Sequence, residues 1–137
     1  MIKKILLATD GSAFSEKAGK YAIYLGKKLE AEVTALHVIE LKPPRFLSPE
    51  DIDRQKAVMA KDCFNVLKKR AENKCVKLST LILVSRSTAR SILDESEDGY
   101  DLIVMGSLGK TGLKKLLLGS VSEEVVRKAS IPVMVIH

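Results

Sequence analysis

Apolar segments and segments with helical periodicity alternate from one end of the chain to the other. The near-continuous apolar segments predict strands at residues 2–9, 33–39, 77–84, 101–105 and 131–136. Segments in which apolar residues recur every three or four positions predict helices over 13–30, 49–73, 87–97 and from 120 onward. Strands that are apolar on both faces are typical of a parallel sheet covered by helices on both sides. The pattern therefore predicts a three-layer α/β/α fold.

Helix starts and buried helix faces can be predicted from the same pattern. Ser12 and Ser48 are favourable N-cap residues, and Pro49-Glu50-Asp51 completes a helix start after Ser48. The first helix is expected to bury Phe14, Ala18, Tyr21, Ala22, Leu25 and Leu29. The second helix is expected to bury Ile52, Met59, Cys63, Val66 and Leu67.

Length and composition favour a single domain spanning residues 1–137. Hydrophobic residues make up 46% and charged residues 29%, and no apolar run approaches the ~18 residues that a membrane span needs. Cys63 and Cys75 have no metal-type spacing, and Cys63 is expected to be a small buried apolar residue. Without a disulfide framework or a secretion signal, the sequence indicates a cytoplasmic protein.

The formal net charge of +6 would permit nucleic acid, a membrane surface or an acidic ligand as partner. The lysines are scattered and only 4% of residues are aromatic, which argues against a nucleic-acid surface. His37 lies inside an apolar strand, so a packed, hydrogen-bonded histidine is expected there. The acids between 94 and 98 favour a solvated face over a metal site, because no histidine joins them.

A glycine-bearing segment follows the fourth apolar run and precedes the last helix. It begins at Gly106 and contains Gly109 and Gly112, and Gly119 then opens the helix. Glycines can turn main-chain amides toward an anion, and the first amides of a helix carry partial positive charge. This order of strand, glycine loop and helix predicts a phosphate-binding site.

Two familiar phosphate motifs do not fit this segment. A P-loop ending in Gly109-Lys110-Thr111 would need a glycine where Val104 stands, and the dinucleotide fingerprint would need Gly-x-Gly. Structural alternatives stay open as well: Gly106 could simply end a strand, and Ser120 with Glu123 could form a capping box without any ligand. Against these alternatives, long loops in compact domains are usually functional or disordered.

The spacing that does fit is Gly-x2-Gly-x9-Gly-Ser, formed by Gly106, Gly109, Gly119 and Ser120. This spacing resembles the ATP-binding signature of the universal stress protein family. The resemblance covers nearly all of the chain, with matching segments at Ile5–Ser12, Leu36–Val38, Asp101–Ser107 and Ser130–Val135. It implies a five-stranded parallel, Rossmann-like sheet of order 3-2-1-4-5, in which the ends of the first and fourth strands face one cleft.

The resemblance also implies which residues would hold an adenine nucleotide. Adenine and ribose would be surrounded by Ala8, Thr9, Asp10 and Val38. The rest of the site, mainly around phosphates carrying Mg²⁺ or Mn²⁺, would be formed by Met105, Gly106, Ser107, Gly109, Lys110, Thr111, Gly112, Gly119, Ser120, Val121 and Ser122. Alternatively, Asp10 could bond the amides of its own turn, Val38 could be a core valine and Lys110 a solvated loop residue. Many members carry a Gly-x-Pro-like turn where this chain has Ser85-Arg86-Ser87.

Three functions are compatible with this pattern. The first is an ATP-binding regulatory protein of the stress response, read by an unknown protein partner, with ADP or AMP as alternative ligands. The second is slow ATP hydrolysis, for which no general base is evident in the sequence. The third is a nucleotide-independent dimerisation or scaffold module, although the intact glycine motif argues against it. Resembling proteins dimerise through the last strand, so a homodimer through Pro132–Ile136 is expected.

Overall fold

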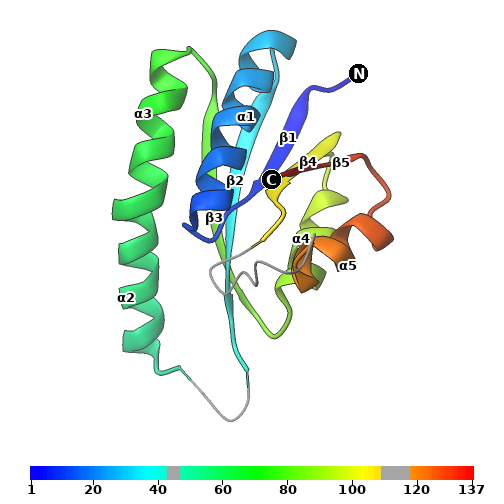
Figure 1. Cartoon of the computed structure of the whole chain (residues 1–137). Coiled ribbons are helices and arrows are strands. Elements are labelled where there is room, and N and C mark those ends of the chain that lie inside the picture. The colour runs from blue at the N-terminus through cyan, green and yellow to red at the C-terminus, as the bar shows by residue number, and fades with distance from the viewer. Residues whose placement is uncertain (43–46, 109–117) are drawn as a thin grey trace.

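The computed structural model describes residues 1–42, 47–108 and 118–137. A five-stranded parallel sheet forms the middle layer, and helices cover both of its faces (Figure 1). The strands are β1 (Lys4–Ala8), β2 (Glu32–Glu40), β3 (Leu78–Ser85), β4 (Leu102–Gly106) and β5 (Val133–Ile136). The helices are α1 (Ala13–Leu29), α2 (Pro49–Met59), α3 (Asn65–Asn73), α4 (Thr88–Ser96) and α5 (Ser120–Lys128). None of these helices combines the length and apolar character that crossing a membrane requires.

The strands follow the order β3-β2-β1-β4-β5, which confirms the predicted order 3-2-1-4-5. The central strand β1 pairs with β2 through Ile5 and Val33, and with β4 through Ile5 and Leu102. Because every pair is parallel, the carboxyl ends of all the strands lie at one edge of the sheet. The strand order reverses between β1 and β4, which is the place where ligands bind in folds of this kind.

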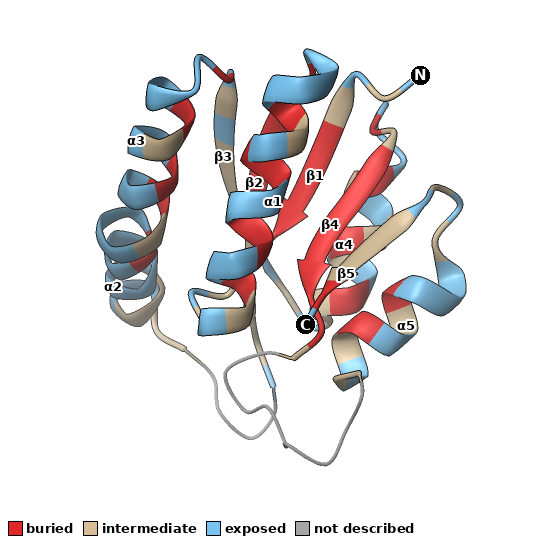
Figure 2. Ribbon diagram, turned by 45° about the horizontal axis from the view of Figure 1, so that its top comes forward, coloured by how far each residue is buried: buried red, intermediate tan, exposed pale blue. Residues whose placement is uncertain are grey.

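The sheet divides the core into two layers. Ile5 and Leu7 of β1 face α1 and α3, whereas Leu6 and Ala8 of the same strand face α4 and α5. All four side chains are buried, and Figure 2 shows β4 buried along its length and β1 buried beyond its start. This burial on both faces is the physical reason why the strand sequences are nearly continuous apolar runs.

Helix α1 packs onto the sheet through small side chains. Its buried residues are Ser15, Ala18, Gly19, Ala22, Ile23 and Gly26. The same small residues also let α3 come close, since a Cβ added at Gly19 would lie 2.7 Å from Leu67 Cδ2 of that helix. The prediction that Tyr21 and Leu29 are buried is wrong, because the small-residue side of the helix faces inward and leaves them 45% and 38% exposed.

A π-helical segment, Ala60–Phe64, interrupts the helix predicted after Ser48. A π turn holds an extra residue, so it rotates the residues that follow relative to those that precede. Met59 and Phe64 are therefore both buried although five positions separate them, and Leu67 continues the buried stripe. The prediction that Val66 is buried is wrong, since the rotation leaves it 42% exposed.

Serine side chains cap three of the helices. Ser12 Oγ accepts a hydrogen bond from the amide of Ser15 at the start of α1, which confirms the predicted cap. The Ser48 hydroxyl does the same for α2, and the Asp51 carboxylate accepts a hydrogen bond from the Ser48 amide. Ser87 caps α4 in the same way. These caps satisfy amides that a helix start leaves without intrahelical partners.

At the amino edge of the sheet, Asp101 ties β4 to β1. Its Oδ2 accepts hydrogen bonds from the amides of Lys3 and Lys4, at 2.9 and 3.0 Å. These two bonds hold the pKa of the Asp101 carboxyl below its ordinary value of 3.8. The ionised carboxylate therefore fastens the two central strands at the end opposite to their carboxyl edge.

Candidate functional site

The ends of β1 and β4 lie side by side at the carboxyl edge of the sheet. Ala8 pairs with Met105, so Thr9-Asp10 and Gly106-Ser107 emerge next to one another. Helix α1 begins shortly after the first of these segments. Two stretches that the sequence assigned to opposite ends of one ligand therefore share one edge of the sheet.

The turn after β1 is organised by hydrogen bonds from its own residues. Asp10 Oδ1 accepts a hydrogen bond from the amide of Ser12 at 2.9 Å, so Asp10 has the local turn role that the sequence left open. Gly11 follows with a φ of 79°, a conformation that glycine adopts without strain. An ionised carboxylate accepts several hydrogen bonds, so this role is compatible with binding ribose hydroxyls as well.

Thr9 links this turn to the surrounding helices and strands. Its buried hydroxyl donates to Ser15 Oγ at 3.1 Å and lies 3.5 Å from Cys63 Sγ. Its carbonyl oxygen lies 2.9 Å from His37 Nδ1, and because a carbonyl can only accept, Nδ1 carries the hydrogen. His37 is thus the hydrogen-bonded strand residue that was predicted. Cys63, expected to be buried and apolar, is instead half-buried and contacts a polar group.

Val38 is a core residue whose main chain faces the site. Its side chain is buried in the core layer between the sheet and α4, so the core-valine alternative is confirmed. The carbonyl of Leu36 accepts a hydrogen bond from the amide of Thr9 at 2.9 Å and therefore points toward β1. Main-chain groups two positions apart in a strand point to the same side. The main-chain groups of Val38 therefore also face the β1 side of β2. They lie beyond Ala8, the last residue of β1 that pairs with β2.

Ser107 joins the two ends of the glycine-bearing segment. Its carbonyl oxygen accepts hydrogen bonds from the amide of Gly119 at 2.7 Å and from the hydroxyl of Ser122 at 2.8 Å. Ser122 is buried, so the hydroxyl expected to reach a phosphate is bonded within the protein. Four predicted site residues lie outside the described residues, namely Gly109, Lys110, Thr111 and Gly112.

Gly106 lies directly against the first turn of α1. A Cβ added there would lie 2.9 Å from the carbonyl carbon of Phe14 and 3.1 Å from its oxygen. Main-chain atoms cannot rotate away as a flexible side chain can, so a larger residue would have to displace the helix. Gly106 therefore ends the strand and also sets how closely α1 approaches β4.

Helix α5 begins directly after a glycine. Its N-cap is Gly119, with φ −70° and ψ 166°, and no side-chain cap hydrogen bond forms among the residues that the structure describes. The alternative of a capping box is not borne out: the extended N-cap residue is Gly119, Ser120 is already helical, and Glu123 pairs with Arg127. The first-turn amides, those of Ser120, Val121 and Ser122, belong to a helix end that carries partial positive charge. This end of α5 is therefore suited to an anion.

The turn after β3, where the sequence departs from the family pattern, is closed by serines. Ser85 Oγ donates to the carbonyl of Ser87 at 3.0 Å and accepts from the amide of Ser87 at the same distance. Ser87 then caps α4. The departure thus yields a compact turn, built from side-chain hydrogen bonds, that leads directly into a helix.

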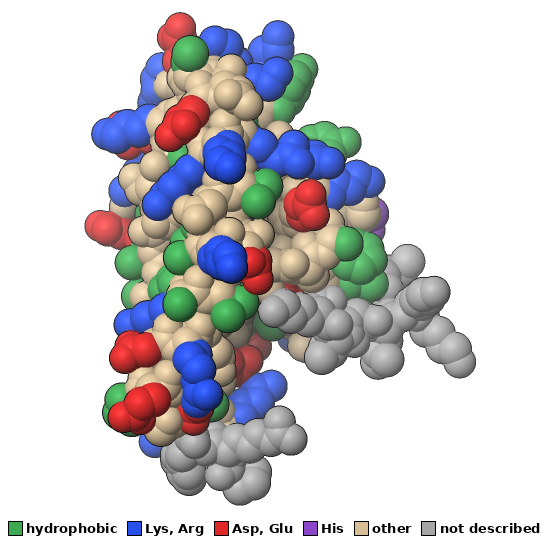
Figure 3. Space-filling model, turned by 90° about the vertical axis from the view of Figure 1, so that its left-hand side faces the viewer, with side chains coloured by type: hydrophobic (Ala, Val, Ile, Leu, Met, Phe, Trp, Pro, Cys, Tyr) green, Lys and Arg blue, Asp and Glu red, His purple; other side chains and the backbone are tan. Residues whose placement is uncertain are grey.

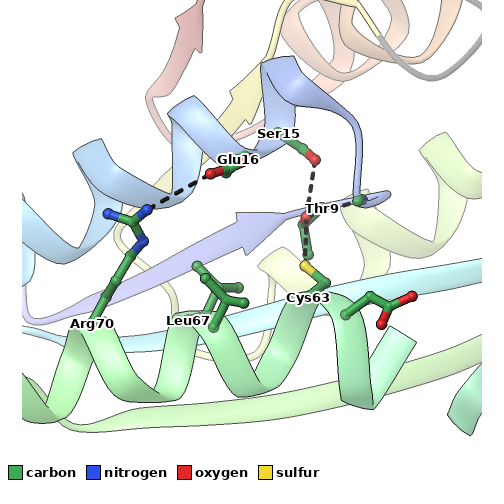
Figure 4. A pocket seen from close by; sticks show the side chains of 9 residues that line it. Thr9, Ser15, Glu16, Cys63, Leu67 and Arg70 are labelled. Atoms are coloured by element: carbon green, nitrogen blue, oxygen red, sulfur yellow. Dashed lines mark hydrogen bonds and ion pairs between the residues drawn. The ribbon is translucent and has the colours of Figure 1, made fainter. Parts of the chain in front are cut away.

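A recess of about 100 Å³ opens beside Thr9, between α1 and α3 (Figure 4). It is lined by Thr9, Gly11, Ser15, Glu16, Asp62, Cys63, Val66, Leu67 and Arg70. An ion pair of 3.7 Å between Arg70 and Glu16 lies at the end away from Thr9.

Sequence reasoning missed Ser15 as a neighbour of the site. The available signal was its spacing of three from Ser12, which places two hydroxyls on one side of the helix start.

Comparison with known proteins supports the family resemblance. The model described as "Universal stress protein family" matches residues 1–137. The chain belongs to the universal stress protein family. A relative of this universal stress protein, MJ0531 of Methanocaldococcus jannaschii, is 38% identical over 140 residues, which cover 99% of this chain and 82% of the relative.

Solved structures share the fold of this universal stress protein. Protein MJ0577 of Methanocaldococcus jannaschii has a TM-score of 0.84 and 36% identity, covering 99% of this chain and 96% of that one. Two more distant structures contain adenine nucleotides. An Arabidopsis thaliana protein with AMP bound has a TM-score of 0.69 and 21% identity, covering 98% and 90% of the two chains. An Archaeoglobus fulgidus protein in complex with dAMP has a TM-score of 0.73 and 19% identity, covering 100% and 98%.

Proposed function

We propose that this universal stress protein binds ATP, or alternatively ADP or AMP, at the carboxyl edge between β1 and β4. The observation that carries the proposal is the start of α5, where the N-cap is Gly119 and no described residue supplies a side-chain cap to the first turn. By contrast, α1, α2 and α4 each have a serine cap. An uncapped helix start near an acidic turn suits a ligand that is anionic at one end and rich in hydroxyl and amine groups at the other.

The nucleoside end of the ligand is assigned to the side of Asp10 and Val38. A carboxylate accepts hydrogen bonds from ribose hydroxyls or from the adenine amine and repels phosphate, so Asp10 belongs at this end. Val38 offers main-chain groups that point past the end of β1, which suits the donor and acceptor edge of adenine. Ala8 and Met105, paired where the two strands end, form the floor between the two parts of the site.

The phosphates are assigned to Gly106, Ser107 and the start of α5. The carbonyl of Ser107 holds Gly119 and Ser122 in place, which orients the α5 amides before any ligand arrives.

Among the described residues there is no group of three or more His, Cys, Asp or Glu that could hold a metal ion. Mg²⁺ or Mn²⁺ would therefore be bound chiefly through the phosphates and water, as Mg²⁺ commonly is at nucleotides.

We further propose that the protein acts as a cytoplasmic regulatory homodimer, read by a protein partner. The supporting observation is that β5 is an edge strand of the sheet. Its residues Val133–Val135 are only partly buried within one chain, and an open edge of this kind favours strand pairing with a second copy. Bound nucleotide would change the glycine-bearing segment, which begins at the end of β4 next to this edge strand.

Isothermal titration calorimetry with ATP, ADP and AMP, each with and without Mg²⁺, tests the nucleotide proposal. We expect saturable heat with at least one of the three and much weaker binding of GTP, because the adenine amine would be lost. Phosphate release in the same samples measures hydrolysis, which we expect to be slow at most. No heat and no thermal shift at millimolar nucleotide would overturn the proposal and favour a nucleotide-independent scaffold.

A simpler measurement supports the calorimetry. The chain has no tryptophan and only three tyrosines, so it absorbs little near 260 nm. Adenine that co-purifies with the protein would therefore be visible in the spectrum of the denatured sample. Chromatography of the released compound would then show whether the cell supplies ATP, ADP or AMP.

A further inference from the structure

Helix α1 presents a stripe of lysines and tyrosines to solvent. This α1 stripe consists of Lys17, Lys20, Tyr21, Tyr24, Lys27 and Lys28, all of them exposed. Tyr21 is 45% and Tyr24 57% exposed, so two of the chain's three tyrosines lie here on the surface. The apolar pattern predicted Tyr21 in the core, and the structure therefore leaves a large aromatic surface that folding does not use.

Charge in the α1 stripe has one sign. No Asp or Glu occurs between Lys17 and Lys28 in the sequence. Lys17 Nζ donates to the main-chain oxygen of His137 at 2.7 Å, and Lys28 Nζ lies 5.7 Å from the centre of the Tyr24 ring. Figure 3 views the molecule from the side of α2 and α3, where Lys and Arg side chains are interspersed with Asp and Glu. Helix α1 thus presents its four lysines together with two tyrosines as a basic, partly aromatic surface.

We propose that the α1 stripe docks an acidic amphipathic helix of a partner protein. Lys17, Tyr21, Tyr24 and Lys28 are spaced by four, three and four residues, which is the spacing of the seam through which two helices pack side by side. The tyrosines at its centre offer ring surface to apolar side chains. The lysines around them would pair with Asp and Glu on the flanks of the docked helix, so the two surfaces are complementary in charge.

The length of the stripe agrees with such a partner. From Lys17 to Lys28 the helix rises about 16 Å, or three turns. Nucleic acid fits less well, because single strands bind in basic grooves with aromatic platforms, whereas this stripe lies on the exposed side of a single helix. A membrane fits less well too, because interfacial helices insert a broad apolar face and this stripe has only two rings. The inference does not depend on nucleotide binding.

The test uses a synthetic peptide with leucines at alternating spacings of four and three and glutamates on both flanks. We titrate it into the ¹⁵N-labelled full chain and follow amide shifts. We expect a dissociation constant of about 10–100 µM, as for small transient interfaces, with the largest shifts on α1. A peptide with lysine in place of every glutamate should bind at least tenfold more weakly. No shifts at 1 mM acidic peptide, or shifts centred on another element, would overturn the proposal.

A matched pair of variants separates docking from general charge attraction. Lys20→Glu with Lys27→Glu should weaken peptide binding at least tenfold. Lys68→Glu with Lys69→Glu makes the same charge change on the exposed face of α3 and should alter binding less than twofold. Equal weakening by both pairs would overturn the proposal. So would tighter binding of a (dT)20 oligonucleotide, or of vesicles with 30% phosphatidylserine, than of the acidic peptide. Melting temperatures near that of the parent chain check that each variant is folded.

Discussion

The hydroxyl of Ser122 donates a hydrogen bond of 2.8 Å to the carbonyl oxygen of Ser107, across fifteen positions of the chain. The amide of Gly119 donates to the same oxygen. One carbonyl therefore holds together the end of β4 and the start of α5. The first turn of α5 consequently has a fixed position relative to the sheet, which is the condition for its amides to act together on an anion.

Removal of this hydroxyl should loosen the start of α5. In Ser122→Ala we expect the free energy of unfolding to fall by about 1–2 kcal/mol, because a buried hydrogen bond is lost while the amide of Gly119 keeps its partner. Nucleotide affinity should fall several-fold. Urea denaturation and calorimetry measure the two effects. Ser130→Ala, at an exposed position, serves as the control and should change neither. An unchanged midpoint for Ser122→Ala would contradict the bracing role.

A methyl group at Gly106 should push α1 away from β4. We expect Gly106→Ala to lower the free energy of unfolding by about 1–3 kcal/mol, because the added carbon meets the main chain of Phe14. Nucleotide affinity should fall with it. Gly99→Ala is the comparison: Gly99 has a φ of 81°, and an added Cβ there would meet nothing within 4 Å. It should lose stability through backbone strain, by about 1–2 kcal/mol, with affinity unchanged. Equal effects of both variants on affinity would refute the local role of Gly106.

Proline at position 120 tests the amides of α5 directly. Proline is favoured at the first position of a helix, and Gly119 already has the extended backbone that precedes proline, so Ser120→Pro should fold normally. It removes one main-chain donor. We expect ATP affinity to fall about tenfold, which corresponds to about 1.4 kcal/mol. Ser120→Ala removes only the hydroxyl and should cost less than twofold. Calorimetry that finds full affinity in the proline variant would place the phosphates elsewhere.

The proposed dimer can be tested at the outward edge of β5. The carbonyls of Pro132 and Ile136 accept hydrogen bonds from β4 and its continuation, so the main-chain groups of Val135 point away from the sheet. Val135→Pro should therefore spare the monomer fold and remove a donor that a second copy needs. We expect light scattering to show twice the chain mass of 15.1 kDa for the parent protein, and the single mass for this variant.

The opposite edge of the sheet supplies the control for the dimer test. Val84 of β3 has outward-pointing main-chain groups by the same reasoning, since the carbonyl of Ser85 accepts a bond from Leu41. Val84→Pro should leave the mass at that of the parent protein. A parent chain with the mass of a single copy at micromolar concentration would rule out the dimer. Dissociation of the dimer by Val84→Pro would show that the interface lies at β3 instead of β5.

Acid should weaken the clamp between β1 and β4. The pKa of Asp101 is lowered by hydrogen bonds from the amides of Lys3 and Lys4, so its contribution to stability is present above about pH 4. That contribution is lost as the pH falls below 3.8 and through the lowered pKa. Asp101→Ala should therefore melt at a lower temperature than the parent at pH 7. This difference in melting temperature should become smaller as the pH is lowered. A difference that stays constant from pH 7 to pH 2 would show that the carboxylate is not responsible.

Most of the fold follows from apolar patterning, because burial on both faces leaves a strong signal in each strand. The order of the strands required the family resemblance, since parallel crossovers of similar length fit more than one order. The orientation of Tyr21 was not predictable from periodicity. An apolar stripe about 100° wide does not show which of two neighbouring residues faces inward, and the small residues of α1 decided it.

The site was predictable as far as its residues interact locally. The Asp10 turn and the Ser12 cap depend on contacts within a few positions, and the structure has both. The helix predicted from residue 120 onward does begin at Ser120, but its N-cap is Gly119 and not Ser120, because both residues are acceptable N-caps. The bond from Ser122 to Ser107 depends on the path of the chain between them. No local pattern encodes such a contact.

The π-helical turn at Ala60–Phe64 makes the helix sensitive to its own length. Removing one residue there would restore a regular helix and turn α2 by about 100° around its axis relative to α3. The change would turn Met59, the one buried residue of α2, away from the core, whereas Leu67 and Ala71 would still anchor α3. A single insertion or deletion, rather than a series of substitutions, can therefore exchange the whole set of α2 side chains that faces the solvent.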